Sequence, residues 1–140
     1  MVIMNISVAA ILVASVVEFI IGAVWYMPIF GDMWGQIHGF KKLSKAQQKE
    51  AQKQMMPMLV VQFIGTVITT FILAKLIVLL PNYSVYTLAL LVWLGFFVPT
   101  QVTSVIFGGT ESKWIVKKSL IMAGGSLLCI LAAAWVLTNI

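Results

Sequence analysis

The sequence contains no arginine, one histidine and one cysteine. Without arginine, it has no guanidinium group to clamp a phosphate or carboxylate through two parallel hydrogen bonds. Cys129 alone cannot form an internal disulfide. His38 and the distant Cys129 supply neither a pair of haem ligands nor a zinc-binding set. We therefore expect no metal ion and no cofactor.

Charged residues are also scarce, at 9% of 140 residues, whereas 61% of the residues are hydrophobic. A soluble helical domain would need a polar face on every helix, and the long apolar segments of this chain have none. The composition predicts an all-α integral membrane protein that forms one domain over residues 1–140. Membrane topology and lipid contact account for the net charge of +5 better than nucleic acid does.

Four apolar stretches are long enough to cross a bilayer, which takes about 20 residues of helix. They are residues 6–25, 58–80, 86–107 and 114–137. We expect them to be four transmembrane helices packed as an antiparallel bundle. No lysine or arginine precedes the first stretch, so the positive segment of a signal peptide is missing and we expect this span to be retained.

The lysines concentrate in two of the three connections between spans. Residues 27–57 and the segment at the start of the fourth span carry eight of the nine, whereas the connection near residues 81–84 carries none. The positive-inside rule predicts cytoplasmic basic connections and both chain termini outside. The lysines of the first connection are expected to contact anionic lipid headgroups, with a solvated helical arm as the alternative; they are Lys41, Lys42, Lys45, Lys49 and Lys53.

The first connection has two parts. Residues 28–39 predict a short helix lying in the membrane interface, because Pro28 suits a first helical turn and Gly39 a C-terminal cap; a glycine-containing turn is the alternative. In the second part, Ser44 followed by Gln47 predicts a capping box at the start of a helix. Pro57 then either breaks the chain or occupies the first turn of the second span.

Glu18 is the only acidic residue within a predicted span. It lies about 10 Å below the cytoplasmic boundary, where an unpaired charge costs roughly 3 kcal/mol or more. Ala14 and Gly22 belong to the same four-residue row of mostly small residues, which predicts helix packing and places Glu18 toward protein. The candidate partners for its carboxylate are Lys117 or Lys118, together with the hydroxyls and amides of the other spans.

The other spans also carry polar or small residues. Gln62 and Thr66 lie in the second span, and Gln101 follows Pro99 in the third. Together with Glu18, they predict a polar site for a proton or a ligand; hydrogen bonding that only joins helices is the alternative. In the fourth span, the adjacent Gly124 and Gly125 predict close helix packing.

Residues 22–34 read Gly-Ala-Val-Trp-Tyr-Met-Pro-Ile-Phe-Gly-Asp-Met-Trp. This segment resembles a family of small bacterial four-helix membrane proteins, domain of unknown function 1761. Its first span typically ends in Gly-x-x-Trp-Tyr-Ser-Pro, followed by Phe-Gly and a Trp; Met27 here replaces the usual Ser. The resemblance implies four spans and a long first connection over nearly the whole chain, and no established activity. We expect the protein in the bacterial inner membrane. The matching residues are Trp25, Tyr26, Pro28, Phe30, Gly31 and Trp34.

Two functions remain open at this stage. One is a membrane binding or transport module with a polar site around Glu18. The other is a structural or accessory protein that packs with itself, with lipid or with another membrane complex. Four small helices bury little surface against one another, so a homo-oligomer is expected in either case. An enzyme ranks last, because the chain lacks paired carboxylates, a glycine-rich phosphate loop and a nucleophile elbow.

Overall fold

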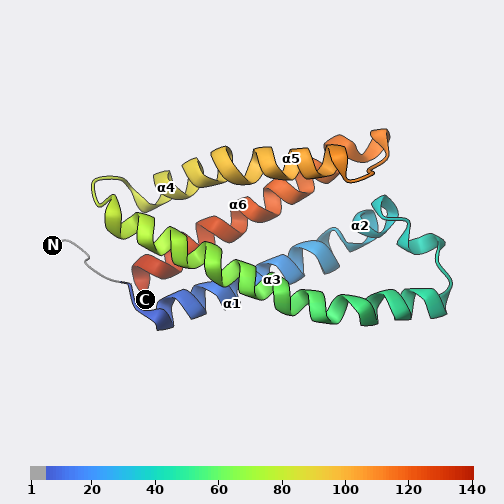
Figure 1. The fold of residues 1–140 in the computed structure, drawn as a ribbon, viewed down its shortest axis with the longest axis horizontal. Coiled ribbons are helices and arrows are strands. Elements are labelled where there is room, and N and C mark those ends of the chain that lie inside the picture. Colours follow the sequence, from blue (N-terminus) through green and yellow to red (C-terminus); the bar gives the residue numbers. More distant parts are fainter. Residues whose placement is uncertain (1–5) are drawn as a thin grey trace.

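The computed structural model describes residues 6–140, which form helices joined by short connections and contain no strand (Figure 1). Four of its helical segments are long and apolar enough to cross a membrane. The prediction of an all-helical chain with four such segments is therefore confirmed. Their bounds are Val8–Ile29, Lys45–Leu79, Val85–Phe107 and Ser112–Asn139.

The first segment consists of α1 (Val8–Val24) and a π-helical turn, η1 (Trp25–Ile29). Pro28 lies inside η1, where its missing N–H removes one helical donor, and the wider turn closes through Phe30 N–H to the Trp25 carbonyl at 3.0 Å. The prediction that Pro28 opens the short helix is therefore wrong. That helix is α2 (Gly31–Ile37), and Gly39 follows it with a φ of 68°, as expected of a helix terminator.

The second segment, α3 (Lys45–Leu79), is a single helix of 35 residues. Ser44 and Gln47 form the predicted capping box at its start. The helix continues through Pro57 without a break, so the lysine-containing segment before Pro57 and the apolar span after it form one continuous helix, and we call the former the arm of α3. At 1.5 Å per residue this helix is about 50 Å long, which exceeds the thickness of the hydrocarbon core of a bilayer, roughly 30 Å.

The third segment also contains a π-helical turn. It comprises α4 (Val85–Val92), η3 (Trp93–Phe97) and α5 (Val98–Phe107), with Pro99 in the first turn of α5. A 3₁₀ turn, η4 (Ser112–Trp114), then leads into α6 (Ile115–Asn139).

Helix α6 packs against α1 on one side and against α4 and α5 on the other, whereas α3 packs mainly on α1 (Figure 1). Small residues line these contacts and allow the helices to approach closely. They include Ala10, Ala14, Ala74, Ala89, Ala133 and Ala134, each at most 3% exposed. The first half of α3 makes few such contacts, and most of its apolar side chains are exposed.

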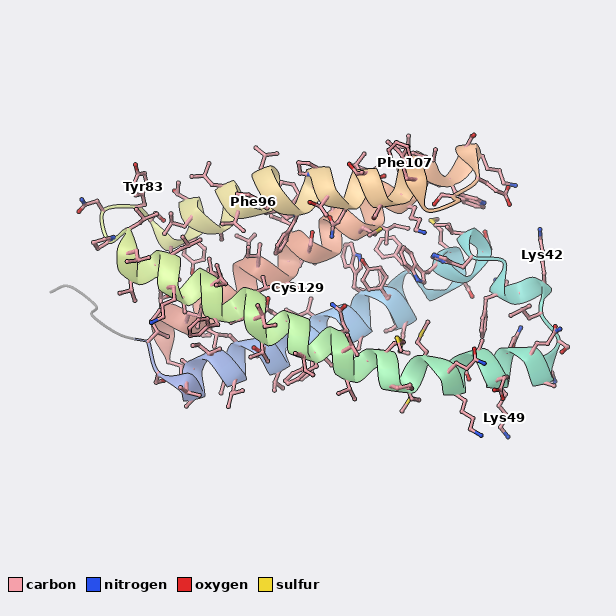
Figure 2. All side chains as sticks on the ribbon, in the orientation of Figure 1. Lys42, Lys49, Tyr83, Phe96, Phe107 and Cys129 are labelled. Carbon is pink, nitrogen blue, oxygen red and sulfur yellow. The ribbon has the colours of Figure 1, made fainter. Side chains whose placement is uncertain are left out.

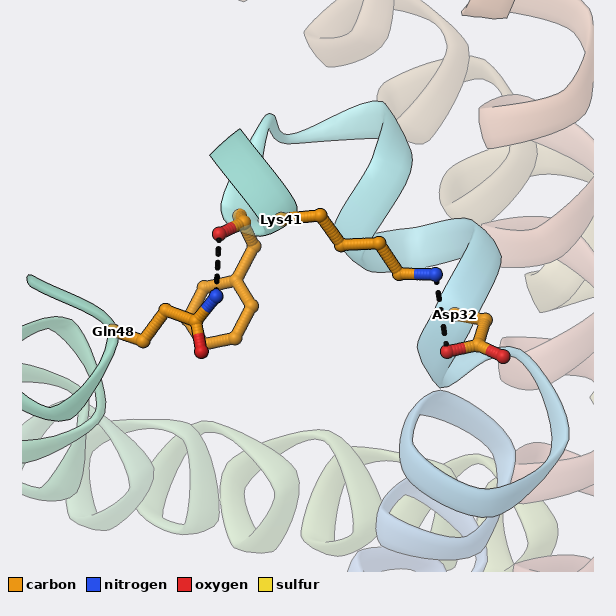
Figure 3. A network of polar contacts seen from close by, with 4 residues as sticks. Asp32, Lys41 and Gln48 are labelled. Atoms are coloured by element: carbon orange, nitrogen blue, oxygen red, sulfur yellow. Dashed lines mark hydrogen bonds and ion pairs between the residues drawn. The ribbon is translucent and has the colours of Figure 1, made fainter. Parts of the chain in front are cut away.

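Both basic connections lie at one end of the molecule. Lys42 and Lys49 are at that end, and Tyr83 is at the other (Figure 2). Within the first connection, Lys41 pairs with Asp32 at 3.4 Å, and the Gln48 amide donates to the Phe40 carbonyl at 3.2 Å (Figure 3). These contacts link the short 3₁₀ turn η2 (Phe40–Lys42) to α2 and to the start of α3.

Candidate functional site

Glu18 lies in the middle of the first span, on the face of α1 that packs against other helices. Its side chain is only 7% exposed, and Ala14 and Ser15, one turn earlier, are fully buried. The Ser15 hydroxyl donates to the Ile11 carbonyl at 2.7 Å. The side chains of Glu18 and Ala14 are thus both buried against other parts of the protein.

Helices α1, α3 and α6 meet at Glu18. The Thr70 hydroxyl of α3 lies 2.5 Å from Glu18 Oε2 and 2.7 Å from the Thr66 carbonyl oxygen. Thr70 is 1% exposed. From α6, the Cys129 thiol donates to the main-chain carbonyl of Glu18 at 3.5 Å. We call Ser15, Glu18, Thr70 and Cys129 the Glu18 cluster.

The two lysines proposed as partners of Glu18 contact aromatic rings instead. Lys117 Nζ lies 5.4 Å from the ring centre of Trp114, and Lys118 Nζ lies 5.6 Å from that of Trp34. Within residues 6–140, the ion pairs are Asp32–Lys41 and Glu111–Lys113, so no cation pairs with Glu18 there.

The four residues of the predicted polar site do not converge. Gln62 is exposed on α3, and Thr66 is in contact with the Glu18 cluster only through its carbonyl oxygen, while its hydroxyl donates to the Gln62 carbonyl at 3.0 Å. Gln101 belongs to a different group, between α5 and α6. There its Oε1 accepts from the Ser126 hydroxyl at 3.2 Å, and Trp93 Nε1 lies 3.1 Å from the same hydroxyl oxygen.

Gly124 and Gly125 form a close contact, as predicted, and the partner is Trp25. A Cβ atom at Gly124 would lie 2.9 Å from the Trp25 ring, and one at Gly125 would lie 2.8 Å from it. The indole Nε1 of Trp25 also donates to the Ile121 carbonyl at 2.8 Å. Gly22 is different, because a Cβ there would meet nothing within 4 Å among residues 6–140.

The family-like motif builds an aromatic corner where α1 turns into α2. The rings of Trp25 and Phe30 have centres 4.7 Å apart, as do those of Tyr26 and Trp34. The start of α6 joins this corner through Lys118 over Trp34. The motif therefore serves the packing of α1, α2 and α6, and it lies about two turns from Glu18 along the helix.

Two surface hollows lie away from the carboxyl group of Glu18. One, of about 530 Å³, follows α5 and is lined by polar and apolar residues, namely Pro99, Thr100, Thr103, Ser104, Phe107 and Gly108. The other, of about 190 Å³, lies between α1 and α3 and includes Ile11, Ala74 and Lys75. Ala74 is one helical turn from Thr70, so this second hollow approaches the Glu18 cluster.

Sequence reasoning missed Ser15 and left Thr70 out of the site. Ser15 is three residues from Glu18 and Thr70 is four from Thr66, so helical spacing was the available signal. Among residues 6–140, no group of three or more His, Cys, Asp or Glu side chains is placed to hold a metal ion.

Comparison with known proteins supplies the family. No curated protein and no solved structure matches the chain significantly. A family model described as a protein of unknown function, DUF1761, matches residues 9–138. This match covers nearly all of the four apolar helices and includes the aromatic corner and the Glu18 cluster. The chain belongs to the DUF1761 family.

Proposed function

We propose that the chain is a membrane-embedded binding or transport module whose polar site is the Glu18 cluster. The observation that carries this proposal is a buried carboxyl group in an apolar helix, hydrogen-bonded to Thr70 and without a cationic partner in residues 6–140. Acidic groups at membrane depth are costly, and in membrane proteins they commonly bind protons, ions or substrates. The cluster therefore supports binding of a proton or a small cationic ligand.

We further propose that the four helices span the bacterial inner membrane with the basic connections in the cytoplasm and both termini outside. The distribution of lysines supports this orientation, since eight of the nine belong to the two basic connections or to the starts of the helices that follow them, α3 and α6. The same lysines are suited to anionic lipid headgroups. Glu18 then lies near the middle of the bilayer.

The test is proton flux into vesicles that contain the purified protein. Vesicles of phosphatidylethanolamine and phosphatidylglycerol would hold a pH-sensitive dye, and a potassium diffusion potential would drive protons inward. We expect flux with the wild-type chain and flux at the level of protein-free vesicles with Glu18→Gln, because an amide cannot release and rebind a proton at neutral pH.

Glu50→Gln is the matched control, since it removes an exposed carboxylate from the arm of α3. Its flux should equal that of the wild-type chain. Wild-type flux that persists in Glu18→Gln would contradict the assignment of the site, and a wild-type chain without flux would contradict proton transport.

The alternative is a structural protein that assembles through α3. Its support is the exposed side of α3, where the Gln62 amide lies among apolar residues such as Met58 and Val61. An amide at membrane depth gains from a hydrogen-bonding partner on a second helix, and a second copy of the chain offers one. Under this alternative, Glu18→Gln alters thermal stability or assembled size, and no vesicle shows flux.

A further inference from the structure

The hydroxyl oxygen of Thr70 is within hydrogen-bond distance of two other oxygen atoms, and each of these two contacts requires a hydrogen atom. Its Oγ1 lies 2.7 Å from the Thr66 carbonyl oxygen and 2.5 Å from Glu18 Oε2. A threonine hydroxyl carries one proton and can accept two further hydrogen bonds. A carbonyl oxygen has no proton to give. The hydroxyl proton of Thr70 therefore points to the Thr66 carbonyl oxygen. The contact between Thr70 Oγ1 and Glu18 Oε2 then contains no proton from Thr70.

From this count we infer that Glu18 is a neutral carboxylic acid that donates to Thr70, and that its proton is the ligand that holds α3 against α1. The inference rests on the site proposed above and names the proton as what binds there. In this arrangement each oxygen-to-oxygen contact contains one hydrogen, and Thr70 acts as acceptor from Glu18 and donor to Thr66.

The surroundings of Glu18 agree with a neutral group. Of the titratable groups of α6, the Cys129 thiol donates to the main-chain carbonyl of Glu18, whereas Lys117 and Lys118 lie over the rings of Trp114 and Trp34. On α3, Lys75 is more than one turn beyond Thr70 and lies over the Phe71 ring, at 5.4 Å from its centre. On the first span itself, Tyr26 is two turns away and packs edge-to-face against Trp34. An ionised Glu18 would therefore be an uncompensated buried charge in this packed state.

Loss of the proton changes the contact between the two helices. The Thr70 hydroxyl would have to rotate away from the Thr66 carbonyl to donate a hydrogen bond to the Glu18 carboxylate. The other lone pairs of the carboxylate would then require water as a donor. The hollow between α1 and α3, lined partly by Ile11, Phe71 and Ala74, comes within one turn of Thr70 along α3 and is a route for this water. Since α3 packs mainly on α1, water between these two helices makes the position of α3 relative to α1 more variable.

Infrared spectroscopy in lipid tests the protonation state directly. At neutral pH, the wild-type spectrum should contain the carbonyl stretching band of a protonated carboxylic acid, and Glu18→Gln should lack it. Thr70→Val, which removes the acceptor but keeps the shape, should move the band to higher frequency. Thr69→Val is the matched control and should leave it unchanged, while Thr70→Ser should retain the wild-type frequency. A wild-type spectrum without the Glu18-dependent band overturns the inference.

Distance measurements between spin labels test the coupling to α3. The background is Cys129→Ser, after its infrared spectrum has been shown to keep the Glu18-dependent band. In it, labels at the exposed Val13 of α1 and Ile68 of α3 report on the contact between these two helices. We expect the distance distribution to broaden as pH is raised through the range in which the infrared band disappears, and to stay constant in Glu18→Gln. A distribution that does not change with pH while the band disappears overturns the coupling.

These results are distinguishable from the outcome of the flux experiment. A Glu18-dependent band without proton flux supports the proton site and contradicts transport. Flux that depends on Glu18, in a chain without the band, supports the proposed function and contradicts the protonated resting state.

Discussion

Glu18 differs from the other three acidic residues in what surrounds its carboxyl group. Asp32 and Glu111 pair with exposed lysines, and Glu50 lies on the exposed side of the α3 arm. Glu18 instead is buried among three helices with Thr70 as its partner. A group in this position contributes both volume and a hydrogen bond to the packing of α1 against α3.

Glu18→Ala should therefore destabilise the protein more than Glu18→Gln. The alanine removes the hydrogen bond to Thr70 and leaves a cavity, at a cost of about 2 kcal/mol, whereas glutamine keeps the volume and an N–H donor. Thermal unfolding in detergent measures both, and Glu50→Ala, at an exposed position, should stay within about 0.5 kcal/mol of wild type. Equal stability of Glu18→Ala and wild type would contradict the packing role.

The inward direction of Glu18 was predictable, because it shares a four-residue row with Ala14 and a charged group avoids lipid. The residue that forms a hydrogen bond with its carboxyl group was not predictable. Thr66, Thr69 and Thr70 are all close in sequence, and only the rotation of α3 about its own axis decides that Thr70 is the one facing α1. That rotation depends on contacts such as Leu73 and Ile77 with the core, which a single sequence does not specify.

At the scale of the helices, the two π-helical turns share one arrangement. Each begins at a tryptophan, Trp25 or Trp93, and each closes on that residue's carbonyl oxygen. Both indoles donate to carbonyls of α6, at Ile121 and Ala123, which lie within one turn before the Gly124–Gly125 contact. Pro28 was expected to open a helix, and neither widened turn was predictable, because both tryptophans are held by these tertiary contacts with α6.

Gly125→Ala tests the contact between Trp25 and α6. The added Cβ would lie 2.8 Å from the ring, so the indole must move and its bond to Ile121 weakens. We expect a loss of about 1–3 kcal/mol in the free energy of unfolding. Gly22→Ala is the matched control, because its Cβ meets nothing within 4 Å and alanine favours a helix by roughly 0.5–1 kcal/mol. Similar losses from both substitutions would refute the role of the Trp25 contact.

At the scale of the whole molecule, charge and apolar surface are arranged along the same axis. Four apolar helices lie between an end that carries the two basic connections and an end that carries residues 80–84 and the C-terminus. The four helices and the pairing of basic connections were predictable from hydropathy and lysine counts alone. The position of α6 between α1 and the α4–α5 rod was not, because all four apolar segments have similar composition.

The proposed orientation makes a prediction about chemical accessibility. In intact cells of a Cys129→Ser background, a thiol reagent that cannot cross the inner membrane should modify cysteine introduced by Asn82→Cys and should spare Gln47→Cys. The reason is that the connection containing Gln47 carries five lysines, which resist translocation, and the one containing Asn82 carries none. Permeabilised cells should show modification at both positions, which controls for local reactivity. Modification of position 47 but not of position 82 in intact cells would reverse the orientation and place the basic connections outside.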